Sequence, residues 1–365
     1  MKISEITDYL ESIAPPALQE SYDNCGLITG HRDMEVNGAL VTLDCTEAVV
    51  DEAIANKCNF IIAHHPIVFS GLKKINGKNY VERVIIKAIK NDIAIYAIHT
   101  SLDNVPGGVN AKIAEKLGLV NMQILAPKNG LLRKLITFCP DNKADEVREA
   151  LFAAGAGQIG NYDSCSFNTA GTGTFRAGEN TDPYVGKKGE LHKEPETRIE
   201  LVYPAHIEGR LVSALLKAHP YEEVAYDLVP LANSWAQAGS GMVGELPEAV
   251  SLPVFLEKLK KDMQTACIRY TPVEGKTVKK VAVCGGSGSF LLGAAMGAGA
   301  DVLVTADFKY HQFFDGENRL VIADIGHYES EQFTKDLLGS LINKKFPTFA
   351  VRLSGINTNP INYYT

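Results

Sequence analysis

The sequence has no paired cysteines and no long apolar run. Its seven cysteines are scattered without a CxxC pair, and their number is odd. This argues against a disulfide framework or a thiolate zinc site and favours a reducing compartment. No apolar stretch approaches the roughly 20 residues of a membrane helix, and Glu5 and Asp8 interrupt the amino-terminal segment, unlike a secretory signal. We therefore expect a cytoplasmic protein with no membrane partner.

The sequence also lacks an excess of basic residues. It carries 36 Lys and Arg against 43 Asp and Glu, a formal net charge of -7. The total charge does not attract nucleic acid, so we expect no nucleic-acid partner. The total charge is still compatible with a local basic patch that binds nucleic acid. With 45% hydrophobic and 22% charged residues, the 365-residue chain is typical of globular proteins with two or three domains.

Predicted strands and helices alternate in two separate parts of the chain. Apolar strand patterns at 38–43, 60–63 and 93–98 are matched by others at 280–284, 302–305 and 320–323, and a helix is expected at 330–342. Between these parts, the order of predicted elements is β-α-β-β-α-β, as in ferredoxin-like modules. We therefore predict an α/β domain formed by residues 1–130 and 236–365, interrupted by an α+β module at 131–235. Gly239-Ser240-Gly241 is interpreted as the returning linker.

Histidines and acids follow four of the predicted strands. They are His64 and His65 after 60–63, His99 and Asp103 after 93–98, Asp307 after 302–305, and His327 and Glu331 after 320–323. Ligands of open α/β sheets bind beyond the carboxyl ends of the strands, so we expect these loops to converge on one crevice.

Imidazole and carboxylate groups in such a crevice predict a metal site. They suit zinc, manganese or iron, and a carboxylate commonly joins two divalent ions. Adjacent residues of an extended segment point to opposite sides, so His64 and His65 would serve one ion each. His327 and Glu331 are four residues apart and share a helix face. We therefore expect two divalent ions.

Other residues near these strands suggest supporting roles. Gly286 and Gly288 lie between a strand and a helix, where backbone N–H groups can bind a phosphate, with Lys309 beside them. A tight turn without a ligand is the alternative for these glycines. His99, Asp307 and His311 are candidate catalytic proton carriers.

The motifs taken together resemble the Nif-three-like family, whose bacterial members are called GTP cyclohydrolase 1 type 2 homologues. The motifs that carry the resemblance are Tyr22-Asp23-Asn24-Cys25-Gly26-Leu27, Ala63-His64-His65-Pro66, His99-Thr100-Ser101-Leu102-Asp103 and Gly326-His327-Tyr328-Glu329-Ser330-Glu331. The resemblance implies a three-layer α/β domain. It also implies one ion held by His64, Asp103 and Glu331, and a second held by His65, His327 and the bridging Glu331.

The middle of the chain shares in this resemblance. Its motifs Gly171-Thr172-Gly173-Thr174-Phe175 and His219-Pro220-Tyr221-Glu222-Glu223 are similar to the PII/CutA-like insert of the longer bacterial members. Family members form homohexameric rings, which the resemblance implies here as well. The family pattern has tryptophan where Tyr22 stands and often glycine where Ala306 stands, so details of the pocket are expected to differ.

Two functions follow from this pattern. The first is a metal-dependent hydrolase of the GTP cyclohydrolase type, in which hydroxide formed on the ions attacks C8 of a nucleotide's guanine ring and formate is released. The second is a non-enzymatic regulatory or interaction protein, in which the metals are structural and the insert senses a ligand. Transcription partners or DNA belong to this second function.

Overall fold

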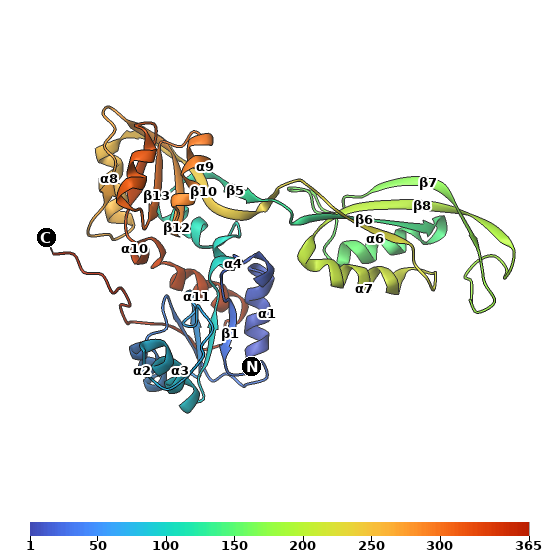
Figure 1. Cartoon of the computed structure of the whole chain (residues 1–365), viewed down its shortest axis with the longest axis horizontal. Helices are drawn as coiled ribbons and strands as arrows, with labels where there is room; N and C mark the ends of the chain where they lie inside the picture. The colour runs from blue at the N-terminus through green and yellow to red at the C-terminus, as the bar shows by residue number, and fades with distance from the viewer. Residues whose placement is uncertain (365) are drawn as a thin grey trace. The chain divides into compact units, whose positions relative to one another are not determined.

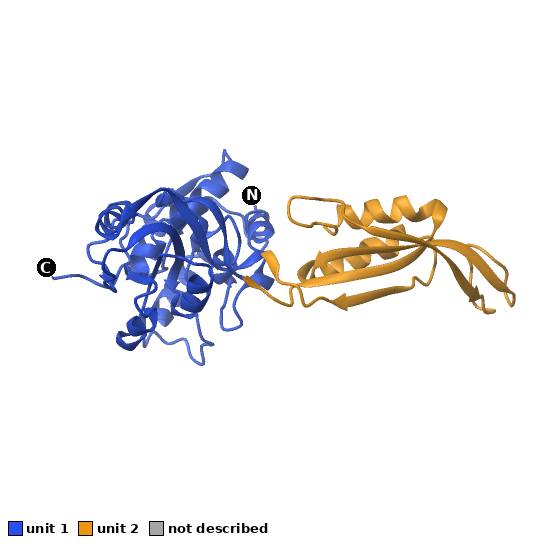
Figure 2. Ribbon diagram, turned by 90° about the horizontal axis from the view of Figure 1, so that it is seen from above, with its two compact units in different colours: residues 1–126, 237–365 blue, residues 127–236 orange. Residues whose placement is uncertain are grey.

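The computed structural model describes residues 1–364. The chain forms two compact units, one built from Met1–Ala126 with Gln237–Thr365 and the other from Pro127–Ala236 (Figure 2). The sequence-based boundaries of the module were 131 and 235. Strands β5 (Val120–Lys128) and β10 (Trp235–Ser251), neighbours in one sheet, lead the chain out of the first unit and back into it.

The first sheet of the larger unit consists mainly of short apolar strands. Its order is β1 (Gly26–Thr29), β4 (Ala94–Ala97), β3 (Phe60–Ala63), β2 (Ala39–Thr42) and β15 (Val351–Leu353). The last four are parallel and β1 is antiparallel to β4. Every residue of β2, β3 and β4 is buried, as expected for parallel strands with both faces covered.

Helices cover this sheet. Helices α2 (Glu47–Ala55) and α3 (Tyr80–Lys90) pack together on it and enclose a core that includes Leu40, Ile61 and Ile95 (Figure 1). Helix α11 (Thr334–Lys345) contacts β2 and β15. The caps fit the sequence: Thr46 and Asn79 accept hydrogen bonds from backbone N–H groups in the first turns of α2 and α3.

The second sheet of this unit has six strands. Its order is β11 (Arg269–Tyr270), β14 (Val321–Asp324), β13 (Val302–Ala306), β12 (Thr277–Ser287), β10 and β5. The strands β12, β13 and β14 are parallel, whereas β10 is antiparallel to β12 and β11 is antiparallel to β14. The remaining helices of the unit are α1 (Ile3–Ile13), α4 (Thr100–Asp103), α5 (Val109–Lys116), α8 (Leu252–Asp262), α9 (Leu292–Gly297) and α10 (His327–Glu331).

Two sequence-based expectations for this unit were wrong. Gly239-Ser240-Gly241 is not a linker but part of β10, whose residues from Met242 onward pair with β12. The helix expected at 330–342 is two helices, α10 and α11. The side chain of Gln332 lies at the break and donates hydrogen bonds to the carbonyls of Met263 and Glu329, an alternative to helical pairing.

The smaller unit has the order β-α-β-β-α-β. Its elements are β6 (Leu132–Pro140), α6 (Ala144–Ala153), β7 (Phe167–Arg176), β8 (Leu191–Pro204), α7 (Glu208–Ala218) and β9 (Tyr226–Pro230). The sheet order is β7-β8-β6-β9 with every pair antiparallel, and α6 packs on α7. One core joins both helices to the sheet through Leu135, Leu151 and Leu215.

Short 3-10 helices complete the chain: η1 (Pro16–Leu18), η2 (Asp141–Lys143), η3 (Ala205–Ile207), η4 (Ser289–Leu291) and η5 (Tyr310–Gly316). Each helix within residues 1–364 is too short or too polar to span a membrane.

Candidate metal centre

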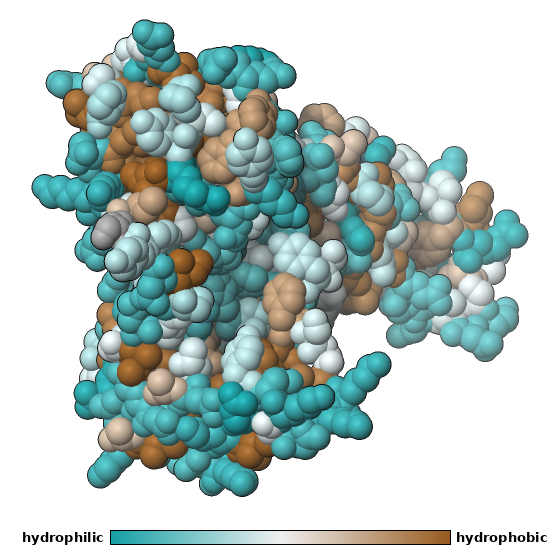
Figure 3. Space-filling view, turned by 60° about the vertical axis from the view of Figure 1, so that its left-hand side comes forward, coloured by the Kyte–Doolittle hydropathy of each residue, from teal (hydrophilic) through white to brown (hydrophobic). Residues whose placement is uncertain are grey.

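The candidate ligands follow strands of both sheets in the larger unit. His64 and His65 come directly after β3, and Asp103 ends α4, which begins shortly after β4. His327 begins α10 and Glu331 ends it, just beyond β14. The expected convergence therefore takes place, but it joins the strand ends of two sheets. The surface of this unit is hollowed between them (Figure 3).

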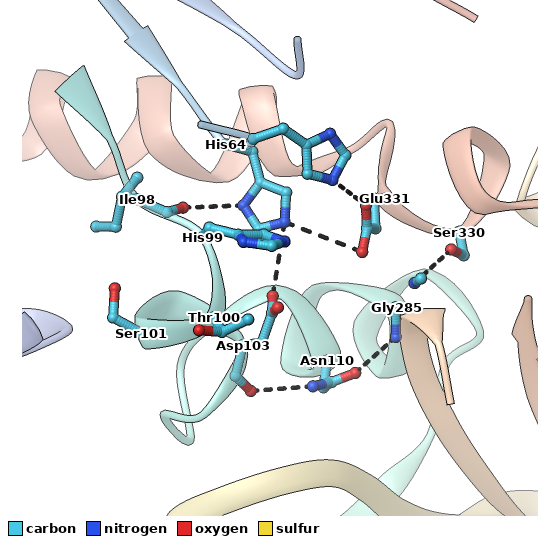
Figure 4. Close-up of polar contacts among 12 residues, drawn as sticks. His64, Ile98, His99, Thr100, Ser101, Asp103, Asn110, Gly285, Ser330 and Glu331 are labelled. Carbon is cyan, nitrogen blue, oxygen red and sulfur yellow. Dashed lines mark hydrogen bonds and ion pairs between the residues drawn. The ribbon is translucent and has the colours of Figure 1, made fainter. Parts of the chain in front are cut away.

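The carboxylate of Glu331 lies at the centre of the cluster. Its Oε2 is 2.9 Å from His65 Nε2 and 3.1 Å from His327 Nε2. Its Oε1 lies on the other side, 3.9 Å from His64 Nε2, which is also 3.6 Å from Asp103 Oδ1 (Figure 4). One carboxylate thus faces two separate groups of side chains, the arrangement of a bridging ligand.

A hydrogen bond at Nδ1 fixes the ring of each of these histidines. The Nδ1 of His64 donates to the carbonyl of Ile98 at 2.9 Å, and that of His65 donates to Asp44 at 2.8 Å. The Nδ1 of His327 donates to Asp307 at 2.7 Å. Metal-binding histidines usually have such a second partner, which orients the ring and leaves Nε2 for the metal.

Burial and mutual contact shift the pKa values of these groups in opposite directions. Burial lowers the pKa of His64 to about 3, so its ring is neutral at pH 7. Burial also disfavours charge on His65, but hydrogen bonds to Asp44 and Glu331 outweigh it and raise its pKa to about 10. Although burial opposes its ionisation, Glu331 has a pKa well below its ordinary value because His327 and His65 stabilise its charge.

The environment of Asp103 disfavours the ionised form of its carboxyl group. Burial and the negative charge of Glu331 raise the pKa of Asp103 well above its ordinary value. Its Oδ1 and the Nε2 of His64 are inaccessible to water and have no hydrogen-bond partner within residues 1–364. Buried polar atoms are rarely left in this state. A cation coordinated by both would satisfy them.

The donor set therefore fits divalent metal ions. Ligand atoms of His65, His327 and Glu331 lie within 4.8 Å of one another, and so do ring nitrogens of His64, His65 and His99. Nitrogen and carboxylate oxygen donors of this kind suit zinc, manganese or iron. The first of these groups contains the three ligands that the resemblance implies for one ion, whereas the second includes His99, which the resemblance does not name as a ligand. The assignment of ligands to two ions stays a prediction.

Two acids that hold the ligand loops in place were not among the sequence-predicted site residues. Asp23 accepts hydrogen bonds from His99 Nδ1 and from the backbone N–H of Thr100, both at 2.9 Å, and it lies in a motif that the resemblance had quoted. Asp44 orients His65 and comes soon after β2, so the carboxyl-end rule that selected the other acids could have found it.

Gly285 and Gly286, which the structure places at the end of β12 rather than in a loop after it, pack against the candidate ligands. The backbone N–H of Gly285 donates to Asn110 Oδ1 and that of Gly286 to Ser330 Oγ, both at 2.9 Å, so these two donors are already paired rather than free for a phosphate. A Cβ on Gly286, which has a φ of +60°, would lie 2.6 Å from Glu331 Oε1. The absence of a side chain at Gly286 thus makes room for the carboxylate.

The remaining sequence-predicted residues have different positions. His99 lines the crevice, and Asp307 orients His327 from its edge. Gly288 packs against Thr305 and Cys284. Lys309 and His311, at the start of η5, do not line the crevice. The structure therefore does not bring the proposed phosphate-binding residues together.

The crevice above the cluster has room for a small molecule. Its volume is about 530 Å³, and exposed aromatic side chains of Tyr22, Phe69 and Phe290 line it together with the ligands. The ring of Phe69 lies 6.1 Å from Tyr22 and 6.3 Å from His99, measured between centroids. The site thus combines a polar floor with aromatic walls.

The chain as a whole is similar to proteins of a known family. The family model described as Duf34/NIF3 (NGG1p interacting factor 3) matches residues 1–360. The chain belongs to the Duf34/NIF3 family. Among curated relatives in this family, it is 40% identical to a protein of Halalkalibacterium halodurans over the full length of both, and 38% identical to one of Bacillus subtilis over 98% of each. Both relatives are named GTP cyclohydrolase 1 type 2 homolog.

Solved structures of Duf34/NIF3 relatives have the same mixed α/β fold with several sheets. A Bacillus cereus protein described as related to NIF3 superposes with a TM-score of 0.87 at 40% identity, covering 100% of this chain and 99% of that one. A Staphylococcus aureus protein superposes with a TM-score of 0.80 at 31% identity and the same coverage.

Proposed function

We propose that this Duf34/NIF3 protein is a hydrolase that depends on two divalent metal ions and opens the ring of a nucleobase, as the name of its relatives suggests. The observation that carries the proposal is that the two oxygens of Glu331 face different side chains. Oε2 contacts the Nε2 atoms of His65 and His327. Oε1 faces the Nε2 of His64, which, like Asp103 Oδ1, has no hydrogen-bond partner within residues 1–364. The chemistry fits zinc, manganese or iron.

Each ion would have its own ligands. His64 and Asp103 would hold one, His65 and His327 the other, and Glu331 would bridge them, in agreement with the distances from its two oxygens. Bound ions of this kind supply Lewis acidity and lower the pKa of water into the neutral range.

We assign to His99 the transfer of a proton in this crevice. Its Nδ1 donates to Asp23, which leaves Nε2 to exchange a proton with water or substrate. The side chain of Asp23 is fully buried and therefore holds the ring in one orientation. Asp307 would act through His327, which it orients, rather than on the substrate.

The aromatic walls support a planar substrate. A purine ring is flat and its faces stack on aromatic side chains, which Tyr22, Phe69 and Phe290 supply around the crevice. Among residues 1–364, no Lys or Arg lines the crevice to pair with a triphosphate, so we expect the base to point inward and the phosphates outward. For ring opening, the proposal requires C8 to lie towards His99 and the metal ligands.

Two features of the wider molecule belong to the same proposal. We propose that residues 127–236 are a ferredoxin-like module of the PII/CutA kind, supported by the 2-3-1-4 order of its antiparallel strands. We also propose a cytoplasmic homohexameric ring, as the family resemblance implies. Light scattering after size-exclusion chromatography tests the ring, and a monomer at micromolar concentration would contradict it.

Formate release from GTP tests the function. Protein loaded with zinc, manganese or iron in turn is saturated with GTP, and we expect turnover that Glu331→Gln abolishes. His99→Gln should retain both ions and lose roughly 100-fold or more in rate. His311→Gln is the matched control, since His311 does not line the crevice and its replacement should leave the rate unchanged.

The opposite results have a clear meaning. If no metal supports formate release from GTP although the wild type holds two ions, the regulatory function is favoured instead. If His99→Gln loses an ion, His99 is a ligand and its assigned proton transfer is wrong.

A further inference from the structure

The inserted unit contains a cavity of its own. It has a volume of about 510 Å³ and lies at the β7 end that pairs with the start of β8, beside the turn after α7. The two sequence motifs of the insert, 171–175 and 219–223, both contribute to its wall. The metal centre accounts for neither motif.

A buried carboxylate faces this cavity. Glu196 in β8 is only 7% exposed, and its Oε1 accepts a hydrogen bond of 2.7 Å from the hydroxyl of Tyr221. Its Oε2 has no hydrogen-bond partner or ion pair within residues 1–364. A Cβ on Gly173, across the strand pair, would lie 2.1 Å from Oε2. The glycine of the first motif therefore makes room for this carboxylate.

The second motif fixes the carboxylate from the other side. His219 Nε2 donates to the carbonyl of Phe138 at 2.8 Å, and His219 Nδ1 accepts from the backbone N–H of Tyr221 at 3.1 Å. The turn is thus held against β6, and the hydroxyl of Tyr221 is held against Glu196. The free oxygen is kept in position rather than left to rotate toward solvent.

Aromatic rings surround the same space. The centroid of Tyr221 lies 6.1 Å from that of Phe175 and 6.3 Å from that of Tyr184, and all three side chains line the cavity. Aromatic faces attract cations, most strongly where water is partly excluded.

The charges around the cavity favour the same kind of ligand. Glu196, Glu222 and Glu223 line it against one Arg176, so three negative groups face one positive group. Glu196 Oε2 is available to accept a hydrogen bond from an N–H or O–H donor in the cavity, and a net negative wall favours a donor that is positively charged.

We propose that this cavity binds a small organic cation with N–H donors, an amine or a guanidinium. The cation donates to Glu196 Oε2 and lies against Tyr221, Phe175 and Tyr184. The ligand contacts the 219–223 turn, because that turn supplies Tyr221. The metal centre is not required for the site, so the inference stands independently of the hydrolase proposal.

Calorimetric titration of the full-length protein tests the site. The probes are agmatine for the guanidinium, putrescine for the amine, tetramethylammonium as a cation without N–H, and guanosine as a neutral planar molecule. We expect saturable binding of agmatine, putrescine or both, and none of the other two. Glu196→Gln keeps the shape and the acceptor for Tyr221 but should weaken binding roughly tenfold or more.

Control variants make the outcome decisive. Glu190→Gln removes the same charge from an exposed position outside the cavity and should leave the affinity unchanged. Tyr184→Leu, at a side chain that is 46% exposed, should weaken binding roughly threefold or more and tests the site even if Glu196→Gln does not fold. No binding of either amine at millimolar concentration, equal binding of tetramethylammonium, or binding of guanosine instead would overturn the proposal.

Discussion

Replacement of Gly286 by alanine tests the packing of the candidate metal centre most directly. The new Cβ would lie 2.6 Å from Glu331 Oε1 and 3.1 Å from His327 Cε1, so the carboxylate of Glu331 must move. Alanine at a φ of +60° also costs about 1–2 kcal/mol, and overpacking of a filled site costs about 1–3 kcal/mol. We therefore expect a loss of about 2–5 kcal/mol in stability and a reduced metal content.

Two measurements check this expectation. Elemental analysis after dialysis gives metal per chain, and thermal unfolding gives the stability, with about 2–4 °C of midpoint shift for each kcal/mol in a unit of this size. Gly293→Ala is the matched control, because a Cβ there meets nothing within 4 Å and Gly293 is exposed in α9. It should stabilise by up to about 1 kcal/mol. Wild-type stability and metal content in Gly286→Ala would refute the reasoning.

Three further predictions concern single side chains. His65→Ala should reduce the metal content from two ions per chain to one while the protein still folds, and unchanged content would refute its assignment as a ligand. Asp307→Ala should weaken metal binding about 10–100-fold, because His327 loses the acceptor that orients its ring, as a metal titration would show. Burial opposes the charge of Asp301, but N–H donors of residues 279 and 280 and the ammonium of Lys276 lower its pKa below 3.8. The ionised carboxylate of Asp301 therefore stabilises the folded protein above pH 3.8, and this stabilisation is lost as the pH falls through the pKa of Asp301 in the folded state. Asp301→Asn should flatten the dependence of the free energy of unfolding on pH in this range. An unchanged slope in denaturant unfolding measured across this range would contradict the prediction.

The candidate ligands could be predicted from sequence because each follows a strand end or a recognisable motif. His64 and His65 stand directly after four apolar residues that form β3, and His327 and Glu331 have the spacing of one helix turn. These are local signals. The carboxyl-end rule needed only the strand positions, and these were close to the observed ones.

The hydrogen bonds of the Gly286 segment and the division into two sheets depend on contacts between residues far apart in the sequence, and no local pattern predicts such contacts. The amides near Gly286 had the composition of an anion-binding turn, and only the positions of Asn110 and Ser330 show that they are already paired. The division into two sheets was also hidden, because β15 pairs with β2 from the far end of the chain. Long-range pairing of this kind carries no short-range signature.

The separation of the ligands along the chain has a consequence for biosynthesis. His65 and Glu331 are in contact although 266 positions separate them, and the complete 127–236 unit lies between. That unit is continuous, so it can fold while the ribosome is still adding later residues. Three of the five candidate ligands, His64, His65 and Asp103, have no partner from α10 until the final tenth of the polypeptide emerges. A nascent chain released before α10 would carry a complete insert but would lack His327 and Glu331.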